Sequence, residues 1–80
     1  MVVLRLFAGA REAAGTGEIE LAGATVDDVL GAARARFGAP FAEVLASSQV
    51  WRNGEPADGS DPVTDDDEVA VLPPVSGGGS

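Results

Sequence analysis

Residues 68–78 read EVAVLPPVSGG, and this stretch gives the strongest evidence in the sequence about the fold. The run from Glu68 to Leu72 has the length of one strand, and Pro73 and Pro74 end it because proline has no N–H to give to a sheet. After Val75 the chain continues as SGGGS, without a side chain large enough to anchor it to a core. We therefore expect a folded domain over residues 1–75 and a mobile glycine tail over residues 76–80.

Two further strands are predicted near the N-terminus. From Val2 to Ala8, both alternating faces are largely apolar, which is typical of an interior strand. Glu18 to Leu21 alternates charged and apolar residues and is predicted as a second strand. Residues 10–14 between them are small and are bracketed by glycines, so they are interpreted as a short connection within an opening hairpin.

One amphipathic helix is predicted after this hairpin. Thr25 is its expected N-cap, and Asp28 three residues later gives an acidic variant of the capping box. Gly38, with Pro40 behind it, is expected to end the helix. Apolar residues at helical spacing predict a stripe that packs on the sheet: Val26, Val29, Leu30, Ala33 and Phe37.

The rest of the chain is expected to complete a ββαββ order. Residues 41–46 are interpreted as a short second helix or a turn. Val50 to Arg52 then form a strand that ends at an Asn53-Gly54 turn, and residues 55–62 are predicted as loop.

The predicted strands present more apolar surface than one helix can cover. A single helix covers one face of a sheet, yet the first and last strands are apolar on both faces. We therefore expect the uncovered face to be a docking surface that includes Phe7 and Val3. Trp51 is assigned equally to the core, to an edge or to such a contact.

Length and composition limit the class of protein. Eighty residues suffice for one domain only, since typical domains have roughly 100 to 200. No cysteine is present, so neither disulfides nor a thiolate metal site can hold the fold together. The apolar start is too short for a secretory signal, and no apolar stretch approaches about 18 residues, so a cytoplasmic location is expected.

The charge and the missing residue types restrict partners and chemistry. A formal charge of −8 repels nucleic acid and anionic membranes, and it favours a basic protein surface, although the acidity also suits plain solubility. His, Cys, Tyr and Lys are absent, so no independent catalysis is expected. Residues 65–68 are acidic but lack the spacing of a calcium loop, so they are interpreted as a solvated turn and no metal is expected.

Several short motifs are typical of one family. The most specific is LPPVSGG over residues 72–78, directly after a valine-rich strand, and it is accompanied by TDDDEV over residues 64–69. Five shorter matches are Phe7-Ala8, Arg11-Glu12, Gly15-Thr16, Thr25-Val26 and Asn53-Gly54. In these motifs, over nearly the whole chain, the sequence resembles the small, sulfur-carrying subunit of molybdopterin synthase, a relative of ubiquitin and of the thiamine sulfur carrier.

This resemblance implies an α+β fold of the ubiquitin-like β-grasp type, with a mixed sheet of four to five strands and one main helix packed on one face. In that family the terminal glycine carboxylate is adenylated by an E1-like enzyme that uses ATP. The carboxylate is then converted to a thiocarboxylate and inserted into the large synthase subunit, where it donates sulfur in molybdenum cofactor biosynthesis.

The resemblance also implies which residues act. Gly78 is the expected site of the thiocarboxylate, with no bound cofactor and with ATP consumed by the activating enzyme. The residues implied to contact the activating enzyme and the large subunit are Phe7, Arg11, Leu72, Pro73, Pro74, Val75, Ser76 and Gly77.

The chain departs from the family pattern by continuing with Gly79 and Ser80. Three interpretations are open: a linker remnant, a precursor that a peptidase trims to expose Gly78 or Gly79, and a relative that no longer carries sulfur. Two other functions are open as well. One is a sulfur carrier for cysteine, thiamine or another metabolite after C-terminal processing, and the other is a ubiquitin-like modifier or binding module without sulfur chemistry.

Overall fold

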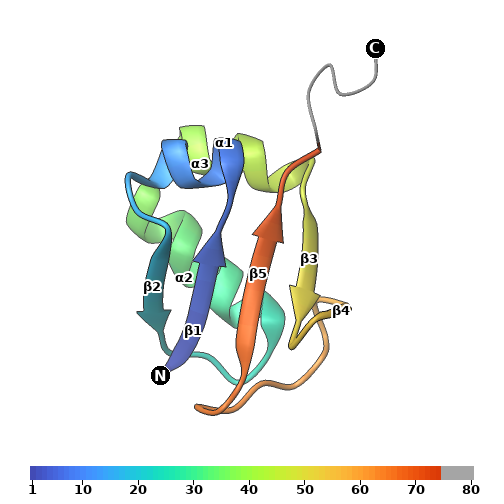
Figure 1. The fold of residues 1–80 in the computed structure, drawn as a ribbon. Coiled ribbons are helices and arrows are strands. Elements are labelled where there is room, and N and C mark those ends of the chain that lie inside the picture. Colours follow the sequence, from blue (N-terminus) through green and yellow to red (C-terminus); the bar gives the residue numbers. More distant parts are fainter. Residues whose placement is uncertain (75–80) are drawn as a thin grey trace.

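The structure is a computed structural model and describes residues 1–74. Strands and helices alternate along the first half of the chain, and the remaining three strands all lie in the second half (Figure 1). The elements are β1 (Val2–Leu6), α1 (Ala8–Ala14), β2 (Glu18–Leu21), α2 (Val26–Phe37), α3 (Ala39–Ala46), β3 (Gln49–Arg52), β4 (Glu55–Pro56) and β5 (Glu68–Leu72).

The five strands form one mixed sheet in the order β2-β1-β5-β3-β4. The first and last strands, β1 and β5, run parallel at its centre, and the other pairings are antiparallel. Leu4 of β1 pairs with Ile19 on one side and with Val69 on the other. The predictions of a mixed sheet and of an interior first strand are thus confirmed, since β1 has a neighbour along both edges.

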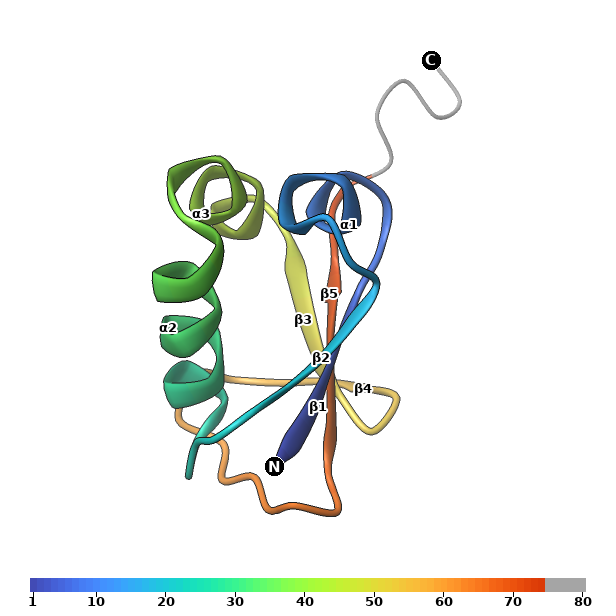
Figure 2. The ribbon, with the colours of Figure 1, turned by 90° about the vertical axis from the view of Figure 1, so that its left-hand side faces the viewer.

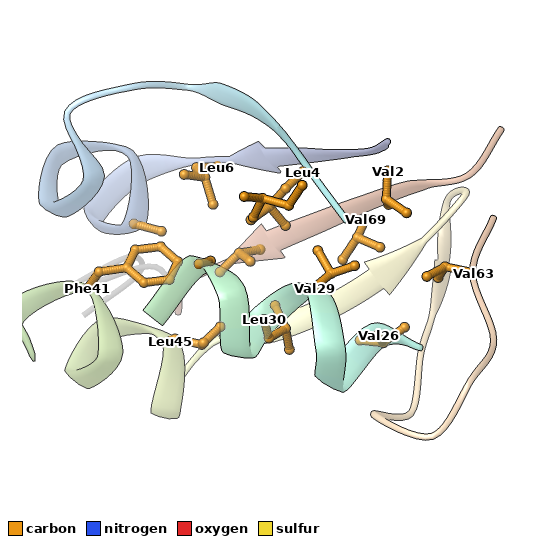
Figure 3. Packing of buried hydrophobic residues seen from close by; sticks show 14 residues of the cluster. Val2, Leu4, Leu6, Val26, Val29, Leu30, Phe41, Leu45, Val63 and Val69 are labelled. Carbon is orange, nitrogen blue, oxygen red and sulfur yellow. The ribbon is translucent and has the colours of Figure 1, made fainter. Parts of the chain in front are cut away.

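The hydrophobic core lies between the sheet and helices α2 and α3, which lie on the same side of the sheet (Figure 2). Phe41 of α3 is fully buried and points toward the end of β1 that carries Leu6 (Figure 3). Its ring centroid lies 5.2 Å from that of Phe37, with the two rings tilted at 56°. The largest fully buried side chains come from β1, α2, α3 and β5: Val2, Leu4, Leu6, Val26, Val29, Phe41, Val69 and Val71.

Helix α1 occupies the segment that the sequence assigned to a connection. The prediction over residues 10–14 is wrong, and the first strand ends at Leu6 instead of Ala8. Alanine is the best helix former, and a helix this short forms because packing supports it. Ala10 is fully buried, and Gly15 ends the helix at φ 78° with its N–H donated to the carbonyl of Arg11 at 2.9 Å.

Helix α2 begins and ends where its sequence signals predict. Thr25 Oγ1 accepts a hydrogen bond from the Asp28 N–H at 3.2 Å, and Asp28 Oδ2 accepts one from the Ala24 N–H at 3.1 Å. The carboxylate thus reaches one residue further back than in a standard capping box. Gly38 ends the helix at φ 88°, a conformation that glycine adopts without strain.

The segment after α2 is a helix, not a turn. α3 runs over Ala39–Ala46, so the chain between Gly38 and Ser47 forms a third helix in the described part of the molecule, where the expected order had one main helix. Pro40 lies in the first turn of α3, where a missing N–H costs no helical hydrogen bond. Pro40, which was expected to help end α2, therefore lies at the start of α3.

The Asn53-Gly54 turn is confirmed, but the loop predicted after it is partly wrong. Asn53 and Gly54 have φ values of 52° and 85°, as the tight turn of a two-residue hairpin requires. Glu55 and Pro56 form the short edge strand β4, which pairs with Arg52 and Trp51.

Among residues 1–74, no helix has both the length and the apolar character needed to cross a membrane.

Candidate functional site

The sheet has one face covered by helices and one face without them. Side chains alternate along a strand, so Val69 and Val71 of β5 are buried under the helices while the residues between and beside them face the other way. The strand register places residues of β1, β2 and β3 on that same side. We call this surface the open face: Val3, Arg5, Phe7, Glu18, Glu20, Gln49, Trp51, Glu68, Ala70 and Leu72.

The open face contains a depression of about 290 Å³. Phe7, Trp51 and Leu72 give it apolar walls, and its other lining residues are Arg5, Gly54, Glu68 and Ala70. Phe7 is 44% exposed, an unusual exposure for a large aromatic side chain. The structure therefore brings Phe7 and Leu72, two of the predicted contact residues, into one surface feature.

Arg5 lies between two carboxylates on this face. Its Nε donates to Glu68 Oε2, and its Nη2 lies 3.5 Å from Glu18 Oε1. The hydrogen bond and the charge of Glu68 raise the pKa of Arg5 above its ordinary value, and Glu18 adds to this effect. Because all three side chains are about half exposed, water screens the interaction, and its main effect is to hold the guanidinium in place.

A second depression, of about 340 Å³, lies where β5 ends. It is lined by Leu72, Pro73 and Pro74 together with Ser47 and Gln49. Leu72 therefore borders both depressions, and the open face continues to the last described residues before the glycine tail.

Arg11 lies apart from these features. It is exposed on α1, and its side chain runs so close to Gly17 that a Cβ there would lie 3.3 Å from Arg11 Nε. Arg11 lines neither of the two depressions described above. Its predicted contact with a partner stays a prediction.

The acidic turn before β5 is held by hydrogen bonds. Asp67 accepts bonds from Asn53 Nδ2 at 2.8 Å and from the Thr64 N–H at 2.7 Å, and these bonds hold the pKa of its carboxyl below the ordinary value. Asn53 Oδ1 also accepts a bond from the Glu68 N–H at 2.9 Å. The turn thus fixes the start of β5, and residues 1–74 contain no cluster of three or more side chains suited to a metal ion.

Two groups of predictions concern residues outside the described part of the chain. They are the site residues Val75, Ser76, Gly77, Gly78 and Gly79, and the mobile tail over residues 76–80. The structure places only the point from which these residues continue, at Pro74 beside the second depression.

The sequence reasoning did not name four of the residues that line the depression of about 290 Å³: Arg5, Gly54, Glu68 and Ala70. A signal for three of them was present, because alternation puts Arg5 on the same side as Val3 along β1 and puts Glu68 and Ala70 on the same side as Leu72 along β5. For Gly54 no such signal exists. It enters the depression only because the β3–β4 turn folds beside β5.

A mixed five-stranded sheet with parallel first and last strands and a helical layer on one face defines the ubiquitin-like β-grasp class. Within that class the chain belongs to the ThiS family, whose model matches residues 4–78. A search of curated proteins found no match.

Solved structures of similar sequence have the same fold. SAMP1 from Haloferax volcanii is 34% identical, with a TM-score of 0.81 over 95% of this chain and 97% of that chain. The small archaeal modifier protein 1 from Methanosarcina acetivorans is 33% identical, with a TM-score of 0.82 over 95% and 94%. A putative molybdopterin converting factor, subunit 1, from Pyrococcus furiosus is 32% identical, with a TM-score of 0.77 over 92% and 97%. The chain is thus a ThiS-like protein, of the class that comprises sulfur carriers and ubiquitin-like modifiers.

Proposed function

We propose that this chain is a sulfur carrier that works through a thiocarboxylate on its C-terminal glycine, as the small subunit of molybdopterin synthase. Its partners are an E1-like adenylating enzyme, the large synthase subunit and a peptidase that exposes Gly78 or Gly79. The chain itself binds no cofactor, and the activating enzyme consumes the ATP.

One observation carries this proposal. The match to the ThiS family runs through residue 78, so it includes the Gly77-Gly78 pair and leaves only Gly79 and Ser80 beyond it. β5 ends at Leu72, and Pro73 and Pro74 after it have no N–H to give to a neighbouring strand. A glycine segment suits a narrow partner tunnel because no side chain obstructs it.

The proposed chemistry balances without a catalytic group on this chain. The glycine carboxylate attacks the α-phosphorus of ATP, pyrophosphate leaves, and an acyl adenylate forms. Hydrosulfide supplied by the sulfur donor then attacks the acyl carbon, and AMP leaves with one of the original carboxyl oxygens, so that the carboxyl carbon carries sulfur in place of that oxygen.

The test compares chains that end at Gly78, Gly79 and Ser80. With ATP, a sulfur donor and the adenylating enzyme of the natural host, a glycine-ending chain should release pyrophosphate and gain the mass of an oxygen-to-sulfur exchange. The chain ending at Ser80 should do neither. A Gly78→Ala chain ending at residue 78 that reacts as fast as its parent would contradict the proposal, as would the failure of both glycine-ending chains.

A protein modifier is the second candidate, and the identity of 34% to SAMP1 favours it. In that case the glycine carboxyl forms an isopeptide bond with a lysine of another protein. This chain contains no lysine, so its own side chains offer no amine for chain formation. Mass spectrometry of tryptic peptides from the natural host separates the two candidates. Because Arg52 is the last trypsin site of this chain, lysines of other proteins that carry the segment starting at Asn53 indicate a modifier, and a free thiocarboxylate indicates a carrier.

A further inference from the structure

The turn between β3 and β4 contains a chemically reactive pair of residues. Asn53 is the single asparagine of the chain, and Gly54 follows it directly. An asparagine before glycine is prone to attack by the next backbone nitrogen on its side-chain amide carbon, because glycine has no Cβ to hinder the approach. Both residues are exposed, and even a Cβ added to Gly54 would meet no atom within 4 Å. The surroundings of the turn therefore leave this pair open to water.

The side chain of Asn53 is nevertheless held at both of its polar atoms. Its Nδ2 donates to Asp67 Oδ1 at 2.8 Å, and its Oδ1 accepts from the Glu68 N–H at 2.9 Å. The Asn53 backbone N–H donates to the Glu68 carbonyl, also at 2.9 Å. These bonds join the turn to the start of β5, at the end of the sheet opposite to Leu72 (Figure 1). Rotation of the side chain toward the Gly54 nitrogen breaks both side-chain bonds.

We propose that Asn53 is a site of spontaneous amide loss, and that its bonds to Asp67 and Glu68 protect it while the turn stays closed. The Gly54 nitrogen attacks Asn53 Cγ, the Cγ–Nδ2 bond breaks, and ammonia leaves with the Gly54 amide proton, so that a succinimide ring forms. Water opens the ring at Cγ to give aspartate, or at the backbone carbonyl carbon to give isoaspartate. The net exchange is ammonia for water, without an oxidant or reductant and independently of sulfur chemistry.

The products of this reaction cannot restore the closed turn. In the aspartate product a carboxylate oxygen replaces Nδ2 of Asn53, 2.8 Å from Asp67 Oδ1, and two carboxylates at this distance repel each other. In the isoaspartate product the backbone is longer by one carbon, which disturbs the pairing of residue 53 with Glu68. A chain that has stayed open therefore carries a lasting mark at this turn.

The experiment incubates the full chain at neutral pH, in buffer and in urea. Intact mass detects the amide-to-acid exchange, and anion exchange resolves the added negative charge. Gln49 is the only other side-chain amide of the chain, so Asn53→Ser verifies that the change arises at residue 53. We expect amide loss to be roughly a hundredfold slower in buffer than in urea, because the folded chain opens the turn in only a small fraction of molecules.

Asp67→Ala and Asp66→Ala form a matched pair for the protecting bond. Asp67→Ala removes the acceptor of Asn53 Nδ2 and should raise the rate in buffer roughly tenfold, the factor that corresponds to one hydrogen bond to a charged group. Asp66→Ala shortens an exposed neighbour whose carboxylate makes no hydrogen bond among residues 1–74, and it should leave the rate unchanged. In urea all three chains should react at the same rate, because the turn is open in each.

The effect of the product on the fold is tested with two amide-to-carboxylate variants. Asn53→Asp should lower the thermal midpoint at neutral pH by about 5 °C or more. Gln49→Glu makes the same change at an exposed residue and keeps the oxygen that accepts from Trp51 Nε1, so it should lower the midpoint clearly less. Equal midpoints for the two variants would show that added charge alone, and not the lost bond to Asp67, accounts for the effect.

The remaining outcomes decide on the site and on its protection. An unchanged mass after incubation in urea overturns the modification site. Equal rates in buffer and in urea, or equal rates for Asp67→Ala and Asp66→Ala in buffer, overturn the protection by the native bonds. Amide loss that is slow in buffer, fast in urea and accelerated only by Asp67→Ala supports the proposal.

Discussion

Single glycines in this chain differ sharply in what surrounds them. A Cβ on Gly23 would lie 2.8 Å from Val29 Cγ2 and 3.0 Å from the Val29 backbone nitrogen. Val29 is fully buried and cannot move aside without disturbing the core. A Cβ on Gly31, by contrast, would have only Arg34 Nη2 nearby, at 3.9 Å. The first position therefore requires glycine for close packing, and the second does not.

We expect Gly23→Ala to lower the free energy of unfolding by about 1–3 kcal/mol, because an extra methyl group overpacks the contact between the β2–α2 connection and the helix. Gly31→Ala serves as the matched control and should raise it by about 1 kcal/mol, since it removes a poor helix former from an uncrowded position. Urea unfolding of both variants checks this prediction. Changes of the same sign in the two variants would contradict it.

The hydrogen bonds of Asp67 predict how the stability of the fold depends on pH. Its folded pKa lies below the ordinary 3.8, because Asn53 and Thr64 donate hydrogen bonds to the charged form. Its contribution to stability is thus fully present above the unfolded pKa and is lost as the pH falls through the folded pKa. Asp67→Asn should lower the thermal midpoint at neutral pH, and the difference from the unaltered chain should shrink as the pH falls below about 4.

Asp66→Asn is the control for Asp67, because it removes the same formal charge from an exposed neighbour whose carboxylate makes no hydrogen bond among residues 1–74. Its midpoint should change little at any pH. Equal pH profiles for the two variants would show that net charge, and not the bonds to Asn53 and Thr64, accounts for the effect.

At the level of elements, α3 contributes to stability out of proportion to its length. Phe41 is fully buried, whereas its neighbour Phe37 at the end of α2 is only half-buried. We expect Phe41→Ala to cost about 3–5 kcal/mol of unfolding free energy, through lost burial and the cavity left behind. Phe37→Ala should cost clearly less.

Chemical denaturation measures both changes. Since a domain of this size has a total stability of only about 4–12 kcal/mol, Phe41→Leu is the milder substitution to use if the alanine variant does not fold. A larger loss at Phe37 than at Phe41 would mean that α3 packs less closely than the structure indicates.

Elements with strong local signals were predicted well. The bounds of β2 and β5 agree with the predicted strands, and Thr25 caps α2 as expected, because alternation and capping act within a few residues. α1 was not predicted, since its small residues have no amphipathic pattern of their own. Ala10 becomes a core residue only because α1 packs against α3.

For the whole molecule, the open face links stability and proposed function. The helical layer covers one side of the sheet, so the other side keeps Phe7, Trp51 and Leu72 accessible while the core remains closed. The second depression continues that surface to Pro74. A partner can thus contact the sheet and reach the tail without disturbing the packed core.

The β-grasp class was implied by the resemblance that the family motifs carry. The sequence by itself determined the ends of the long helix, the last strand and the family motif before the glycines. These features follow from residue type and short-range spacing, which act locally along the chain. Only the tertiary structure decided that Arg5 is held by Glu18 and Glu68, that Gly54 and Trp51 lie beside Phe7, and that Arg11 lies apart from both depressions. Those relations depend on pairing β5 with β1 and β3 across long sequence separations, and such pairing becomes visible only when the sheet is assembled.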